Sequence, residues 1–328
     1  MRYFFKKRFG YKFVVNDHHH KIADTLTRVA NGEVTRLIIN MPPRYGKTEM
    51  AVICFIAWCI AKNSSSKFIH LSYSDDLALD NSSQVKELVQ SEAFQELWPI
   101  ELKKDSKSNK KWYTSARGGV YATAAGGAIT GFGAGSTDEE EEFGGAIIID
   151  DPLKVDDADS ETKRNHVNKR MNTTIKSRAN SRSTPIIVIM QRVHDEDMSG
   201  YLMDGGTNED WERLELSAEV SDGVALWPWK HTWDELQVMM KADKYTYSGQ
   251  YLQKPVPDDG VYFTRDSFKW YDKRPGTLNF YGSSDYAVTE VGATSLSTAY
   301  LVLTLMMIFI SVIGGQVKQS QTFGLKSS

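Results

Sequence analysis

A short apolar run followed at once by a glycine–lysine–threonine turn is the feature that most constrains this chain. Residues Leu37–Asn40 (LIIN) have the composition of a buried strand, and Met41–Thr48 (MPPRYGKT) follows directly. A strand leading into such a turn is typical of a P-loop, whose backbone N–H groups and lysine surround phosphates while the threonine hydroxyl meets Mg²⁺. Met41 stands where the usual first glycine would be. The turn alone therefore indicates a nucleotide site without establishing one.

A second apolar strand further along the chain has the pattern that accompanies a P-loop in nucleotide-binding proteins. Residues Ala146–Asp151 (AIIIDD) end in two carboxylates, as a Walker B strand does. We expect Lys47 to contact the β- and γ-phosphates of ATP, the Thr48 hydroxyl to be a ligand of Mg²⁺, and Asp150 to hold that ion through water, as a hard oxygen ligand should. Asp151 is the candidate for orienting or deprotonating the attacking water. A second metal-side carboxylate, or a cap for the loop that follows, are the alternatives for Asp151.

Three further residues are candidates for the chemistry. Arg44, beside Tyr45 and Gly46 inside the turn, is placed to neutralise charge on the γ-phosphate, the alternative being a surface arginine. Gln191 and Arg192 follow the apolar run Pro185–Met190. Ligands of open α/β sheets sit at the carboxyl ends of the strands, so a γ-phosphate sensor there is physically sensible.

Two polar clusters invite a metal site, and both have plainer explanations. The segment His194–Asp197 (HDED) is more typical of a helix start, with Asp195 near the N-cap. Consecutive side chains in His18–His20 do not face one site. A partial contact with adenine, or a place on the surface, is the expectation for these histidines.

Composition restricts the class of protein only loosely. The chain has 328 residues, 41% of them hydrophobic and 25% charged, with a net charge of -3. These values are ordinary for a globular protein and exclude a uniformly basic nucleic-acid coat, but not a local basic groove. Cys54 and Cys59 lack partners at zinc spacing and lie in an apolar stretch, which favours free thiols in a reducing compartment. The first residues make a poor signal peptide.

Apolar runs alternate with helical patterns over most of the chain. This alternation predicts an α/β fold in which a parallel P-loop NTPase sheet is covered by helices on both faces. Gly126–Gly135 holds five glycines and is expected to be a loop, while Asp138–Glu142 is expected to be a solvated acidic face. The expected helices are 19–30, 49–61, 77–90 and 161–178, and the expected strands are 37–40, 67–72, 118–125, 147–149, 185–190 and 278–285.

The ordered set of motifs resembles the large terminase subunit of tailed bacteriophages and prophages. The similarity runs from about residue 15 to 290. It rests on the following segments: Ile38–Thr48 (IINMPPRYGKT), Ser72–Ala78 (SYSDDLA), Thr130–Gly135 (TGFGAG), Ile147–Pro152 (IIIDDP), Met190–His194 (MQRVH) and Tyr251–Pro255 (YLQKP).

The resemblance implies a DNA-packaging motor with two domains. The first is an ATPase of the additional-strand type, and the second is a ribonuclease H-like nuclease that uses two metal ions, Mg²⁺ or Mn²⁺. It also implies double-stranded DNA, a small terminase subunit and a portal protein as partners, an oligomer on the portal ring, and a place in the bacterial cytoplasm rather than in the virion. On this basis we expect an ATPase domain over residues 1–225, a connecting region over 226–276 and the first nuclease strand over 277–290.

Matching by position assigns roles to residues of this sequence. Arg44, Lys47 and Thr48 match the Walker A motif, and Asp150 and Asp151 match the Walker B motif, where relatives commonly carry glutamate at the position of Asp151. Gln191-Arg192 matches the coupling motif. Asp285 matches the first metal-binding aspartate of the nuclease.

The resemblance stops after Glu290. Residues 291–328 include an apolar run, Ala299–Ile313, that is short for a membrane-spanning helix and has no flanking anchor before it. The adjacent reading frame, with codons that the protein sequence permits, gives an acidic, tryptophan-containing segment typical of the nuclease. The interpretation is that the tail is an aberrant, out-of-frame product and that the nuclease is truncated and inactive. A membrane anchor, a helicase-like DNA-dependent ATPase and the inactive remnant of a decayed prophage are the alternatives.

Overall fold

The computed structural model describes residues 1–106, 108–129, 131–137 and 143–256, together with the backbone of the strands at 279–288, 294–304 and 307–309. The chain divides into two compact units, Met1–Tyr262 and Phe263–Ser328. The acidic run Asp138–Glu142 lies outside the described residues, as does the end of the expected connecting region.

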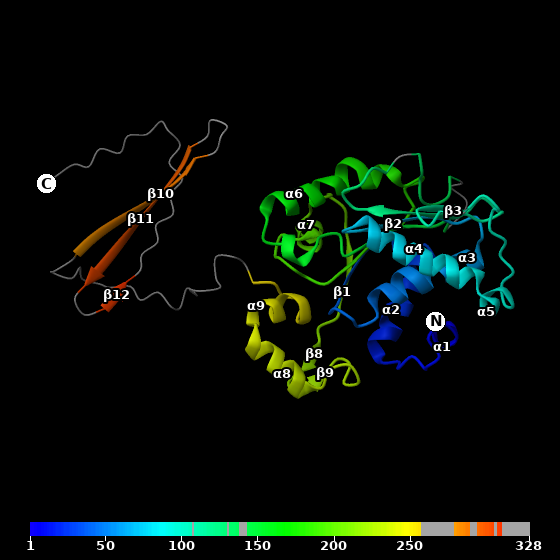
Figure 1. The fold of residues 1–328 in the computed structure, drawn as a ribbon, viewed down its shortest axis with the longest axis horizontal. Helices are drawn as coiled ribbons and strands as arrows, with labels where there is room; N and C mark the ends of the chain where they lie inside the picture. The colour runs from blue at the N-terminus through cyan, green and yellow to red at the C-terminus, as the bar shows by residue number, and fades with distance from the viewer. Residues whose placement is uncertain are drawn as a thin grey trace. The chain divides into compact units, whose positions relative to one another are not determined.

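A seven-stranded sheet of order β3-β4-β2-β5-β6-β1-β7 forms the centre of the first unit (Figure 1). All neighbouring strands are parallel except β3, which runs antiparallel to β4 at one edge. The α/β expectation is therefore confirmed, and every strand expected within this unit forms. The strands of this sheet are β1 (Arg36–Asn40), β2 (Lys67–Ser72), β3 (Lys111–Tyr113), β4 (Gly119–Ala124), β5 (Ile147–Asp150), β6 (Ile186–Met190) and β7 (Glu212–Glu215).

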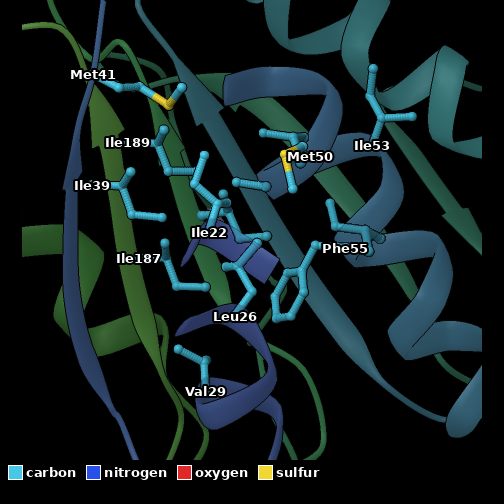
Figure 2. Packing of buried hydrophobic residues seen from close by; sticks show 14 of the residues in the cluster. Ile22, Leu26, Val29, Ile39, Met41, Met50, Ile53, Phe55, Ile187 and Ile189 are labelled. Atoms are coloured by element: carbon cyan, nitrogen blue, oxygen red, sulfur yellow. The ribbon is translucent and has the colours of Figure 1, made fainter. Parts of the chain in front are cut away.

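Helices cover both faces of this sheet, which explains why its central strands are apolar throughout. Ile38 packs in the core of one face, while Leu37 and Ile39 pack in the core of the other. Figure 2 shows the second of these cores, where Ile39 faces Ile22 from the helix before the P-loop. The helices of this unit are α1 (Arg2–Phe9), α2 (Asp17–Ala30), α3 (Phe55–Lys62), α4 (Asp75–Gln90), α5 (Glu92–Gln95), α6 (Glu161–Arg170), α7 (Met198–Met203), α8 (Trp233–Ala242) and α9 (Lys244–Thr246).

Two of the expected helices are less regular than their sequence patterns indicate. The helix after the P-loop starts with π-helical geometry, η1 (Glu49–Cys54), before it continues as α3. The expected helix 161–178 is α-helical only to Arg170, and a π-turn and a 3₁₀-turn follow it. After the 3₁₀-turn the chain pairs with the glycine-rich segment, since the Arg178 carbonyl accepts a hydrogen bond from the Ala134 N–H and the Asn180 N–H donates to the Ala134 carbonyl.

The segment after β7 is more structured than a plain connection. It forms a two-stranded hairpin of β8 (Glu219–Ser221) and β9 (Val224–Ala225), then α8, α9 and the π-turn η5 (Tyr247–Tyr251). A capping box formed by Thr232 and Glu235 begins α8.

The second unit contains an antiparallel sheet of β10 (Asn279–Val288), β11 (Thr294–Thr304) and β12 (Met307–Phe309). The expectation that the first strand ends at Asp285 is wrong, since pairing with β11 continues to Val288. The first part of the apolar run, up to Thr304, belongs to β11. Among the described residues, no helix is both long enough and apolar enough to cross a membrane.

Candidate nucleotide-binding site

The loop between β1 and the helix that follows it has the backbone geometry of a phosphate-binding turn. Gly46 adopts φ 90° and Arg44 adopts φ 65°, the left-handed region that glycine occupies readily and arginine rarely. The helix begins directly after this turn, with the Met50 N–H donating to the Gly46 carbonyl at 3.0 Å. The free N–H groups at such a helix start, with the helix dipole, favour an anion.

The residues that the sequence matched to the Walker A and Walker B motifs lie in contact at the carboxyl edge of the sheet. The Lys47 ammonium lies 2.7 Å from Oδ1 and 2.5 Å from Oδ2 of Asp151. The Thr48 hydroxyl donates to Asp150 Oδ2 at 2.7 Å. Residues separated by about one hundred positions in sequence are therefore in direct contact, as the sequence pattern predicts.

Asp150 is a buried carboxylate with one oxygen that accepts no hydrogen bond from the described residues. Its side chain is 1% exposed, and its Oδ1 has no hydrogen-bond partner within the described part of the chain. Burial, and then the neighbouring Asp151 charge, raise the pKa of Asp150 to about 7, against the opposing influence of Lys47 and Thr48. An orphaned carboxylate oxygen beside a threonine hydroxyl fits the oxygen donors that Mg²⁺ prefers. Asp150 and Thr48 are thus suited to hold that ion.

The strand between β1 and β5 brings Gln191 into the same site. β6 pairs with β1 on one side and β5 on the other, which is the additional strand that the resemblance implied. The Gln191 N–H donates to Asp151 Oδ1 at 3.2 Å, and the Gln191 side-chain oxygen is buried without a partner among the described residues. Asp151 has φ 44°, so its carboxylate is presented from a left-handed turn at the end of β5.

Arg192 lies beside the site, but its guanidinium takes part in an internal ion pair. The side chain is 6% exposed, and its Nε lies 3.0 Å from both carboxylate oxygens of Asp197. Asp197 also accepts from the Gly200 N–H at 3.0 Å and so caps α7. The expected helix start is therefore present, with Asp197 as the N-cap two residues after Asp195.

Two other candidate residues, Arg44 and Asp285, are not part of this cluster of contacts. The Arg44 side chain is exposed, while the neighbouring Tyr45 is fully buried and its hydroxyl lies 3.1 Å from His231 Nδ1. Asp285 is on β10 of the second unit.

The first two histidines of His18–His20 are not on the surface. His18 and His19 are 0% and 3% exposed and pack around Trp227, with ring centroids 5.4 Å and 4.8 Å from its ring. Their Nε2 atoms are buried and have no hydrogen-bond partner among the residues described. A Cβ added at Gly46 would lie 3.6 Å from His19 Nε2, so this cluster supports the P-loop directly.

Sequence reasoning missed several residues that hold the site in place. Asp197 anchors Arg192, and Gln253 accepts from the Arg192 N–H at 3.1 Å. Arg8 forms a 2.7 Å ion pair with Glu49, directly after Thr48. Gln253 belongs to the motif Tyr251–Pro255, which carried a signal, whereas nothing in the local sequence marks Arg8.

Comparison with known proteins extends this description at the level of the fold. No protein-family model matches the chain, and no curated protein matches its sequence. The crystal structure of the HK97 bacteriophage large terminase is similar, with a TM-score of 0.50 and 13% identity over 89% of this chain and 64% of that one. The large terminase of a thermophilic bacteriophage gives a TM-score of 0.45 and 12% identity, over 85% of this chain and 64% of that protein. The likeness to the HK97 structure shows that the chain shares the fold of that large terminase. The chain spans less than two thirds of the length of both proteins.

Acid is expected to destabilise the first unit through the buried histidines. Burial lowers the pKa of His18 to about 4 and of His19 to about 3, from an ordinary value of 6.5. Between these values and 6.5 the unfolded chain binds protons that the folded chain does not, so the free energy of unfolding falls as the pH drops from 7 to 5. Denaturant titrations of His18→Gln should show a weaker pH dependence than those of the wild type.

The matched control for this measurement is His20→Gln, because His20 is exposed on the same helix. Its pH dependence should equal that of the wild type. An unchanged pH dependence in His18→Gln would contradict the assignment of the acid sensitivity to this cluster.

Proposed function

We propose that this chain is the ATP-hydrolysing motor subunit of a large terminase, which packages viral double-stranded DNA into proheads. The observation that carries the proposal is the convergence of Lys47, Thr48, Asp150 and Asp151 at the carboxyl edge of an additional-strand sheet. The fold shared with the HK97 large terminase supports it.

The ion pair between Lys47 and Asp151 indicates how nucleotide binding and water activation are linked. A phosphate at the turn competes with Asp151 for the ammonium group of Lys47, a residue that is only 7% exposed. Once Lys47 contacts the phosphate, Asp151 keeps its hydrogen bond from the Gln191 N–H and has a free carboxylate oxygen to orient a water. Mg²⁺, held by Thr48 and Asp150, would neutralise charge on the β- and γ-phosphate oxygens.

The remaining candidates receive different roles in this proposal. Arg44 is exposed and has a long side chain, so it is free to reach the γ-phosphate from the loop. Gln191 directly follows β6 and donates its N–H to Asp151, so a movement of the Asp151 carboxylate would be passed to that strand. Arg192 acts as a positioning residue through Asp197 and not as a direct phosphate contact.

The partners and the nuclease follow from the family and remain part of the proposal. A portal ring, a small terminase subunit and double-stranded DNA would be the partners, with several copies on the portal in the cytoplasm of the bacterial host. The domains are those expected from the sequence, with residues 1–225 as the ATPase, 226–276 as a connecting region and 277–290 as the first nuclease strand. Asp285 would bind one of the metal ions of an intact nuclease.

Two other functions make different predictions. A helicase-like DNA-dependent ATPase would separate strands of a duplex, which a packaging motor has no need to do. A membrane-anchored nucleotide-binding protein would fractionate with membranes.

Replacing Lys47 by alanine is expected to lower ATP hydrolysis about 100-fold or more, because the variant lacks the cation that faces the phosphates. Phosphate release by the purified full chain measures this. Lys241→Ala, at an exposed position of α8, is the control and should keep wild-type activity. Equal hydrolysis by wild type and Lys47→Ala would refute the site assignment.

Asp151→Asn is expected to lower hydrolysis by roughly 10²- to 10⁴-fold while ATP binding is retained, because the amide cannot accept a proton from water. A fluorescent ATP analogue reports binding, and phosphate release reports hydrolysis. Asp156→Asn changes an exposed carboxylate six residues after Asp150 and should leave both unchanged. Loss of nucleotide binding in Asp151→Asn would assign that residue to the metal site instead.

The tail after Glu290 is interpreted as out of frame, which leaves the nuclease incomplete. Two-metal cleavage needs several carboxylates around ions about 4 Å apart, and the segment that would supply the others is replaced by Val291–Ser328. Sequencing the gene across codons 285–328 is expected to show an adjacent open frame that continues from Glu290 with acidic residues and tryptophans. Absence of such a frame, or plasmid cleavage by the pure protein in Mn²⁺, would contradict this interpretation.

A further inference from the structure

A basic surface lies at the β3 edge of the sheet, at the opposite end of the strand order from β7. The segment Glu101–Arg117 contains six basic and two acidic residues in a chain whose net charge is -3. This segment is therefore positively charged, whereas the chain as a whole is negatively charged. The nucleotide site described above uses none of these residues.

Two lysines place their ammonium groups near the same aromatic ring. Lys103 Nζ lies 5.3 Å and Lys111 Nζ 5.6 Å from the ring centroid of Tyr113, and Lys111 Nζ is also 5.7 Å from that of Phe132. Within the described part of the chain, neither lysine forms an ion pair with a carboxylate. Each ammonium group is held against an aromatic ring and keeps its positive charge available to an anion from outside.

The aromatic support under these lysines is fixed by packing. Phe132 is 7% exposed and stacks on Tyr121 with ring centroids 5.6 Å apart, and the Tyr113 ring lies 6.0 Å from Phe132. Phe132 belongs to the glycine-rich motif Thr130–Gly135, for which the nucleotide chemistry supplies no role.

The backbone that carries the lysines is anchored as well. The Lys103 N–H donates to the Tyr113 carbonyl at 2.9 Å, and Lys86 of α4 donates to the Ser106 carbonyl at 2.6 Å. The buried Trp112 donates to Ser82 of the same helix at 3.0 Å. A preorganised surface loses little conformational entropy when it binds a partner.

We propose that the basic surface of Lys103, Lys111, Tyr113 and Phe132, flanked by the exposed Lys104 and Lys110, binds the sugar–phosphate backbone of double-stranded DNA. This inference rests on the proposed function, which makes DNA the substrate. Phosphates follow one another about 3.4 Å of helix axis apart on each strand, so a duplex backbone offers an anion to each ammonium group of this surface. Contacts of this kind carry no sequence preference, as a motor that moves along DNA requires.

Lysine on an edge strand has a competing explanation, since charged side chains there protect a sheet from edge-to-edge association. That explanation predicts aggregation on neutralisation and no effect on DNA. The two explanations therefore separate in a binding experiment that also records the oligomeric state.

The test uses the full chain, two blunt duplexes of unrelated sequence and fluorescence anisotropy at several salt concentrations. Lys103→Gln/Lys111→Gln should weaken binding equally to both duplexes and lower the slope of log affinity against log salt by about 2. The ratio of the wild-type affinity to that of the double variant should then fall about tenfold between 50 and 200 mM salt. Lys103→Arg/Lys111→Arg should restore the slope.

Lys62→Gln is the matched control, because Lys62 Nζ lies 4.8 Å from the ring centroid of Trp58 on α3, outside the basic surface. It should bind DNA as the wild type does, and all these variants should keep basal ATP hydrolysis. Wild-type duplex binding with an unchanged salt slope in the double variant would overturn the surface and leave the motor intact. A wild type that hydrolyses ATP without binding duplex would also overturn the surface, whereas absence of both activities would refute the proposed function itself.

Discussion

The site depends on the parallel pairing of β5, β6 and β1. Parallel strands present their carboxyl ends at one edge of the sheet, so the P-loop after β1, the two aspartates after β5 and Gln191 after β6 must converge. Burial on both faces holds these strands in register, since each contributes apolar side chains to both cores. The chemistry is therefore positioned by the hydrophobic effect acting on residues that take no part in it.

Burial and neighbouring charges then determine which ions the side chains of Asp150, Asp151 and Lys47 can bind. Asp150 is desolvated almost completely and lies next to a second carboxylate, so its charge is costly without a cation. Lys47 balances Asp151 directly, and a phosphate would compete with that carboxylate for the same ammonium. An added phosphate or metal ion would therefore change which of Lys47, Asp150 and Asp151 pair with each other.

Lysines at the β3 edge show the opposite arrangement. At the candidate nucleotide site Lys47 has a carboxylate partner, whereas Lys103 and Lys111 lie at the ring of Tyr113 and have no carboxylate at ion-pair distance within the described residues. A paired ammonium is suited to exchange one anion for another. Unpaired ammonium groups on a rigid support are suited to meet an anion from outside, which is why the two surfaces are assigned different partners.

The sequence by itself determined the apolar strands β1, β2, β4, β5 and β6 and predicted that Lys47, Thr48, Asp150 and Asp151 share one site, but it did not indicate the edge strands β3 and β7. Apolar runs such as Ile186–Met190 need burial on both faces, and the turn chemistry of Gly46 and Lys47 is local, so both could be predicted. Only the tertiary structure decided the fate of charged and polar side chains whose partners are distant. It placed Arg192 in an ion pair with Asp197 and buried His18 against Trp227, because pairing and desolvation depend on which surfaces meet and not on local pattern.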